Sequence, residues 1–170
     1  GRIQTSGQFN SGSRKVVFEG TGELSGGITF NDVDIHGGVD FRTSHFGAIG
    51  VATINGTLSI KTGGYVSTAY SPKYGPNSLL EYNTGGNYNA FNAWNSSWGI
   101  LDKPQDVLVT NGTALRITTG RLAYGNVTVT QNGLISLEGA DPFLGCKNLY
   151  VEALGTFESG PAGILSLDSD

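Results

Sequence analysis

Apolar and polar residues alternate along this chain in short triplets that are separated by Gly- or Asn-rich corners. Residues 33–35 (Val-Asp-Ile) lead through His-Gly-Gly to 39–41 (Val-Asp-Phe), and 52–54 (Ala-Thr-Ile) lead through Asn-Gly-Thr to 58–60 (Leu-Ser-Ile). Alternation with a period of two is typical of strands with one buried face. Asn-Gly and Gly-Gly supply the positive φ angles that tight corners need. The pattern therefore predicts short strands joined by tight turns.

This phrase of two triplets repeats along the chain. It returns at 107–117, 127–137 and 149–159, and weaker copies begin at Val16 and Leu80. A period of about 20 residues with strands inside each unit is the signature of a solenoid. We therefore predict an all-β fold, a single-stranded right-handed parallel β-helix of about seven to eight short coils. The handedness follows from the rule for parallel crossovers.

The repeat is interrupted in two places and is weak at both ends. The spacing lengthens at 62–79 and at 89–106, and we expect these segments to be loop insertions that protrude from one side of the rod. Residues 1–30 are the least regular and are the candidate for an N-terminal cap. The apolar run at 164–167 resembles the beginning of another coil. We therefore expect one domain over 1–170 that is a segment of a longer protein.

The composition agrees with an all-β chain and excludes some classes of function. Of 170 residues 27 are Gly and 14% are charged, whereas about 25% are charged in ordinary globular proteins. The net charge is −4 and no run of Lys and Arg occurs, so a nucleic-acid footprint is missing. No apolar stretch is long enough for a transmembrane helix. The single cysteine, Cys146, is interpreted as a small buried hydrophobic residue.

The densest polar cluster is formed by Asp32, Asp34, His36 and Asp40. Alternation places the first three on the outer face of one strand, with Asp40 beyond the corner. Carboxylates at this spacing can hold Ca²⁺ or act as acid and base on a sugar. However, an outer strand face needs polar residues in any case. We favour this solvent-facing explanation, and a calcium site at Asp32, Asp34 and Asp40 or a catalytic site are the alternatives.

The outward residues of successive triplets do not indicate catalysis. The coils that follow the acidic cluster offer Thr53 and Ser59 on the same face, not a second acidic row. A catalytic groove is expected to draw carboxylates and basic residues from several stacked coils, and their absence counts against an enzyme. No zinc-type or nucleotide-type motif occurs. The chain is therefore predicted not to be an enzyme and to need no cofactor, with Ca²⁺ as the alternative.

Aromatic residues gather around the two predicted insertions. The candidate glycan contacts among them are Tyr74, Tyr82, Tyr88, Trp94 and Trp98. Flat rings beside Asn and Asp side chains suit the C–H faces and hydroxyls of sugars. The favoured alternative is that these rings pack the insertions onto the coil wall, because aromatic side chains bury large areas.

Residues 74–88 (Tyr-Gly-Pro-Asn-Ser-Leu-Leu-Glu-Tyr-Asn-Thr-Gly-Gly-Asn-Tyr), followed by Trp94, resemble a recurring segment of Bacteroidetes cell-surface proteins. These are large adhesin-like proteins, many of which are exported by the type IX secretion system. The phrases at 9–13, 29–33 and 55–58 agree with this resemblance. It implies an extracellular β-helical stalk or adhesive segment at the bacterial surface, and it implies no catalytic residues.

The expected function is thus a structural or adhesive module that presents aromatic loops to a glycan or a surface protein. Two alternatives from other classes remain open. One is a β-helical polysaccharide lyase or hydrolase. The other is a subunit that docks by one flank or end to other protein segments in a larger secreted assembly.

Overall fold

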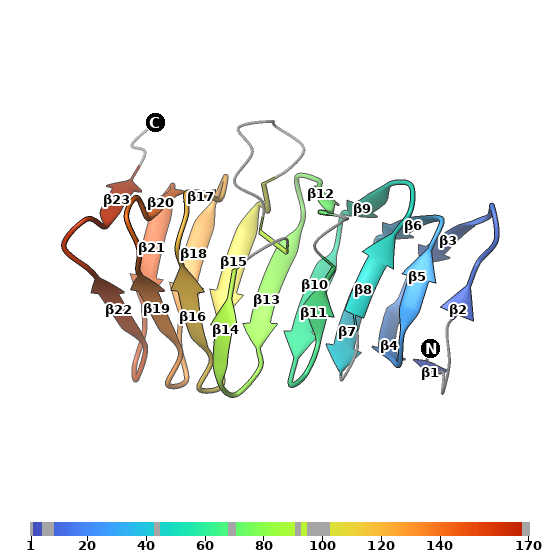
Figure 1. The fold of residues 1–170 in the computed structure, drawn as a ribbon, viewed down its shortest axis with the longest axis horizontal. Coiled ribbons are helices and arrows are strands. Elements are labelled where there is room, and N and C mark those ends of the chain that lie inside the picture. Colours follow the sequence, from blue (N-terminus) through green and yellow to red (C-terminus); the bar gives the residue numbers. More distant parts are fainter. Residues whose placement is uncertain are drawn as a thin grey trace.

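The protein is a β-solenoid of about seven turns built from parallel strands (Figure 1). The computed structural model describes residues 2–4, 9–42, 45–67, 71–90, 93–94 and 103–167. All the regular elements in these residues are β-strands, and every strand pair among them is parallel. The predicted all-β parallel solenoid is therefore confirmed. The described part of the chain contains no helix that could span a membrane.

The laps of the chain form three walls, and the first wall is one continuous sheet over the described residues. Its eight strands follow one another in a fixed order: β1 (Arg2–Gln4), β4 (Thr21–Ser25), β7 (Gly38–Arg42), β10 (Thr57–Lys61), β13 (Leu79–Asn83), β15 (Asp106–Val109), β18 (Asn126–Val129) and β21 (Asn148–Val151). This order means that each lap hydrogen-bonds to the preceding one.

The second and third walls are each divided into two sheets. The second wall consists of β2 (Phe9–Asn10), β5 (Ile28–Phe30), β8 (His45–Ala48) and β11 (Tyr65–Val66), then β14 (Asn87–Asn89), β16 (Ala114–Ile117), β19 (Leu134–Leu137) and β22 (Thr156–Ser159). The third consists of β3 (Lys15–Phe18), β6 (Asp32–Ile35), β9 (Ala52–Ile54) and β12 (Lys73–Tyr74), then β17 (Arg121–Leu122), β20 (Phe143–Cys146) and β23 (Ile164–Leu167). Both walls break near the fifth lap, which begins at β13.

The register agrees with the repeat in the sequence. Val33 pairs with Ala52, Val107 with Val127, and Val127 with Leu149. Inward residues of the middle laps have almost no exposed surface, as for Val33, Val107 and Val127, which are at most 1% exposed. Cys146 is also buried, as expected. The apolar period thus sets which face of each strand enters the core.

The irregular segments contain more strand than the sequence suggests. The first predicted insertion, 62–79, includes β11 and β12, which continue the second and third walls. In the second, 89–106, Ala90, Ala93 and Trp94 are buried, and 91–92 and 95–102 lie outside the described residues. Within 1–30, β1 to β5 stack in the same walls as later laps. The run at 164–167 is the third strand of the last lap rather than a new coil, since β23 pairs with β20.

Glycines stack closely at the corner between the third and first walls. A Cβ atom on Gly56 would lie 1.9 Å from the Gly37 carbonyl oxygen, and one on Gly37 would lie 2.3 Å from the Gly20 carbonyl oxygen. The amides of Gly37 and Gly56 donate to the carbonyls of Phe18 and Ile35, both at 3.0 Å. The tight corner therefore requires a residue without a side chain in successive laps.

Replacing Gly56 by alanine is expected to lower the free energy of unfolding by about 1–3 kcal/mol, because the backbone must shift to admit the methyl group. Chemical denaturation followed by circular dichroism measures this loss. Gly20→Ala is the matched control. Gly20 is the first of the stacked corner glycines, and no atom lies within 4 Å of the place that its methyl group would take. Equal stability of the two variants would contradict the close-packing argument.

Candidate functional site

The outer face of the first wall carries a row of polar residues from four successive laps. Glu23 of β4 pairs with Asp40 of β7, Asp40 with Ser59 of β10, and Ser59 with Glu81 of β13. These residues lie on the same face of the sheet because paired positions in parallel strands point the same way. Three carboxylates are therefore aligned along the rod. We call Glu23, Asp40, Ser59 and Glu81 the acidic row.

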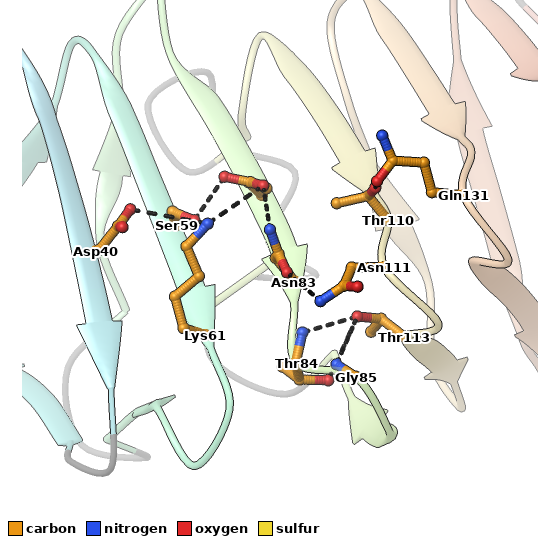
Figure 2. A network of polar contacts seen from close by, with 11 residues as sticks. Asp40, Ser59, Lys61, Asn83, Thr84, Gly85, Thr110, Asn111, Thr113 and Gln131 are labelled. Carbon is orange, nitrogen blue, oxygen red and sulfur yellow. Dashed lines mark hydrogen bonds and ion pairs between the residues drawn. The ribbon is translucent and has the colours of Figure 1, made fainter.

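Basic and amide side chains run beside the acidic row. The Lys61 ammonium lies 3.5 Å from Glu81 Oε1 and 3.9 Å from Asp40 Oδ1, so one cation sits between two carboxylates (Figure 2). Arg42 Nε lies 3.9 Å from Glu23 Oε2. Carboxylates and cations from several stacked laps thus converge on one face.

Glu81 is the most firmly held member of the acidic row. Its carboxylate accepts hydrogen bonds from Ser59 Oγ at 2.5 Å and from Asn83 Nδ2 at 2.9 Å. Burial acts to raise the pKa of Glu81, but these two hydrogen bonds and the Lys61 ammonium outweigh it and lower the pKa. Glu81 is therefore ionised at neutral pH and orients Lys61 and Ser59.

The polar contacts continue into the following laps. Asn111 Nδ2 donates to Asn83 Oδ1 at 2.9 Å, and Thr110 Oγ1 lies 3.2 Å from Gln131 Oε1. Thr113 Oγ1 accepts from the Thr84 amide at 2.8 Å. In this part of the face the side chains satisfy one another, and they connect laps rather than leave groups open to a ligand.

A shallow hollow of about 500 Å³ lies toward the N-terminal end of the same face. It is lined by Thr21, Gly22, Glu23, Gly38, Asp40 and Thr57. Gly38 stands between Thr21 and Thr57 in the register and has no side chain to fill the space between them. The acidic row therefore borders an open depression where a polar ligand has room to contact Glu23 and Asp40.

Three of the five predicted glycan contacts are core residues. Tyr74 is 2% exposed, and Tyr82 and Trp94 have no exposed surface. A ring without an exposed face cannot stack on a sugar. Tyr88 is partly buried, and Trp98 lies outside the described residues. The hypothesis of aromatic loops presented to a glycan therefore fails for Tyr74, Tyr82 and Trp94.

These buried rings close the break in the third wall. The Tyr74 hydroxyl of β12 donates to the Ala93 carbonyl, and Trp94 Nε1 donates to the Leu122 carbonyl of β17 at 2.8 Å. The ring centroids of Tyr82 and Trp94 are 6.5 Å apart. Residues 93–94 thus link the third-wall strands on either side of the fifth lap, where no third-wall strand is assigned in the described residues.

The three predicted calcium ligands lie on two walls. Asp32 and Asp34 are on β6, whereas Asp40 is on β7 beyond the corner. Asp32 Oδ1 accepts from the Val51 amide at 2.7 Å, and Asp34 Oδ2 is 2.9 Å from Lys15 Nζ. No group of three or more His, Cys, Asp or Glu side chains that could hold a metal ion occurs in the described ranges. The corner therefore separates Asp40 from the other two.

The acidic row was missed in the sequence because residues of different walls were aligned. Asp34 and Thr53 belong to the third wall, whereas Ser59 belongs to the first wall, where its aligned neighbours are Asp40 and Glu81. Glu23 was not predicted as a site residue because β4 lies within the irregular segment 1–30, where the repeat is weak. Counting the period from Asp40 back to Glu23 would have revealed the second acidic residue.

Comparison with protein-family models, with curated proteins and with solved structures finds no match to this chain.

Proposed function

We propose that this chain is a stiff binding module of an extracellular, adhesin-like bacterial surface protein, and that it contacts a glycan at the hollow on its first wall. The observation that carries the proposal is the hollow itself, in which Glu23 and Asp40 border a space left by Gly38. Small-molecule and sugar sites are concave and contain a few well-placed polar groups. A continuous sheet beneath the hollow holds these groups at a fixed spacing.

The chemistry of the hollow favours neutral sugars or amino sugars. Its lining offers the carboxylates of Glu23 and Asp40 and the hydroxyls of Thr21 and Thr57. Ionised carboxylates only accept hydrogen bonds, so they suit sugar hydroxyls and protonated amino groups. An acidic polysaccharide would place like charges together at the lining, and the nearby cations, Arg42 and Lys61, already lie 3.9 Å from Glu23 and Asp40 respectively. We therefore expect uncharged or amino-containing glycans to bind better than polyanionic ones.

A second function is favoured by the alignment of carboxylates. Glu23 and Asp40 are on adjacent strands, whose backbones lie about 4.8 Å apart. Retaining glycosidases hold their two carboxyl groups about 5–5.5 Å apart. The sequence pattern showed no convergence of acidic and basic residues from several laps, and that absence counted against an enzyme. The structure brings such residues together on the first wall. This convergence supports glycoside cleavage as the alternative function of the hollow.

A glycan array with purified protein tests the binding proposal. Gly38→Thr should fill the hollow without disturbing the fold, because a Cβ at this position meets its nearest atoms at an ordinary 3.8 Å. We expect binding to a neutral or amino-containing glycan that falls at least about tenfold in Gly38→Thr and in Asp40→Asn. Asp34→Asn on the third wall is the matched control and should bind like the wild type.

Binding that survives both hollow variants, or an array with no bound glycan, would contradict the proposal. Incubation of the same glycans with the protein, followed by assay for new reducing ends or unsaturated products, separates the two functions. Product release that Glu23→Gln and Asp40→Asn abolish would replace binding by catalysis.

A further inference from the structure

A lysine, a glutamate and an asparagine meet on the first wall where the fourth and fifth laps pair. Lys61 of β10 and Asn83 of β13 are direct partners in the register, so their backbones lie about 4.8 Å apart. Glu81, two residues before Asn83, points to the same outer face. Its Oε1 atom lies 3.5 Å from Lys61 Nζ and accepts a hydrogen bond from Asn83 Nδ2 at 2.9 Å (Figure 2). One carboxylate oxygen therefore holds an amine and an amide together.

The oxygen of the Asn83 amide has its own hydrogen-bond donor. Asn111 Nδ2, from the corner after β15, donates to Asn83 Oδ1 at 2.9 Å. Such a donor stabilises the negative charge that develops on the oxygen when a nucleophile attacks the amide carbon. The side chains of Lys61 and Glu81 are only 17% and 16% exposed, so the pair is largely shielded from bulk water. The four side chains thus supply a nucleophile, an acid and base, an electrophilic carbon and a donor to its oxygen.

We propose that Lys61 and Asn83 become joined by an amide bond between their side chains, and that Glu81 promotes the reaction. The Lys61 ammonium gives one proton to the Glu81 carboxylate, and the neutral Nζ attacks Asn83 Cγ. As the Nζ–Cγ bond forms, Asn111 stabilises the charge on Oδ1, and Glu81 carries protons from Nζ to Nδ2. The Cγ–Nδ2 bond then breaks, and Nδ2 leaves as an ammonium ion. Glu81 ends ionised, as it began, and no oxidant or other reactant is consumed.

The fold favours this reaction through proximity. Because both reacting groups are held on one oxygen atom of a continuous sheet, the attack is an intramolecular step that needs only rotation of the flexible Lys61 side chain. Glu81 is ionised at neutral pH, so the neutral pair is a minor state and the bond should form slowly after folding. The product would tie the fourth lap to the fifth and limit how far the unfolded chain can separate them. This inference does not depend on the glycan proposal.

Intact-mass spectrometry of the whole chain, after incubation at neutral pH and denaturation, tests the proposal. The wild type is expected to weigh about 17 Da less than its sequence, the mass of one ammonia molecule. Lys61→Arg keeps the positive charge but is no nucleophile, because its guanidinium stays protonated. Lys61→Arg and Glu81→Gln should each have the full mass of their own sequence. Lys15→Arg is the matched control and should keep the deficit, because Lys15 contacts the Asp34 carboxylate on the third wall.

Digestion with trypsin locates the bond. Trypsin does not cleave after an acylated lysine, so fragments 43–73 and 74–116 should remain joined in the wild type. Ring closure at an Asn-Gly pair, such as Asn111-Gly112, also releases ammonia but leaves these fragments separate, and that result would overturn the proposal. A wild type of full mass after incubation, or a deficit that persists in Lys61→Arg, would overturn it as well. If Glu81→Gln loses its β-sheet circular dichroism, Asn83→Ser serves as the second variant, with full mass expected.

Discussion

Replacing Trp94 by alanine is expected to lower the free energy of unfolding by about 3–5 kcal/mol, because a fully buried aromatic side chain leaves a large cavity. Trp94 has no exposed surface, and its indole N–H donates to the Leu122 carbonyl. The side chain lies in the fifth lap, between the third-wall strands β12 and β17, where the described residues include no third-wall strand. The loss is measured by chemical denaturation of the purified variant.

Two comparisons make the Trp94 result specific. Trp94→Phe should lose less stability, since it keeps most of the ring volume and gives up the hydrogen bond. Tyr65→Ala removes a ring that is 50% exposed and should change the free energy of unfolding by less than about 0.5 kcal/mol. If Trp94→Ala kept full stability and lost glycan binding instead, the assignment of Trp94 to the core would be wrong.

Raising the pH above about 10 is expected to destabilise the protein steeply, by up to about 4 kcal/mol per pH unit. Burial raises the pKa of Tyr88 to about 12, against an opposing contact with the Val66 backbone. Burial also raises the pKa of Tyr74 and of Tyr82 well above the usual value of 10.0. Between about pH 10 and about pH 12, the three tyrosines of the unfolded chain release protons that those of the folded chain retain. The stability that depends on these three neutral phenols is thus fully present below their pKa in the unfolded chain, and it is lost as the pH rises above that value.

The loss of stability at alkaline pH is measured by chemical denaturation, as the change in the midpoint denaturant concentration between about pH 9 and about pH 11. Tyr82→Phe should remove about a third of the pH dependence. It should cost little stability at neutral pH, because the Tyr82 hydroxyl has no hydrogen-bond partner in the part of the chain that the structure describes. Tyr150→Phe, at a ring that is 50% exposed, is the control. A midpoint that stays constant across this range would show that the three phenols titrate alike in both states.

The period of the apolar triplets was sufficient to predict the solenoid and much of its register. Val33 and Val127 alternate with polar neighbours, and a slip by one residue would expose both of them. Strands without this alternation were not found in advance. β20 (Phe-Leu-Gly-Cys) and β4 (Thr-Gly-Glu-Leu-Ser) have glycine within the strand, and their partners in other laps rather than their own sequence make them strands.

The candidate site was less predictable, because triplets on either side of a corner look alike in the sequence. Asp34 and Asp40 occupy equivalent places in their triplets, yet a single corner assigns them to different walls. The aromatic residues were difficult for a different reason, because rings expected at the surface lie in the core. Tyr74 and Trp94 lie in segments that appeared to be protruding loops, and only the break in the third wall explains why such large rings turn inward.

Among the described strands, only those of the first wall pass through the fifth lap without a break, and this has an evolutionary consequence. Residues can be gained or lost between Trp94 and β15 without moving Glu23, Asp40, Ser59 or Glu81, since these four lie on the hydrogen-bonded strands β4, β7, β10 and β13, which precede that segment. Related chains are therefore expected to vary most in length at this segment while the distances along the first wall stay constant.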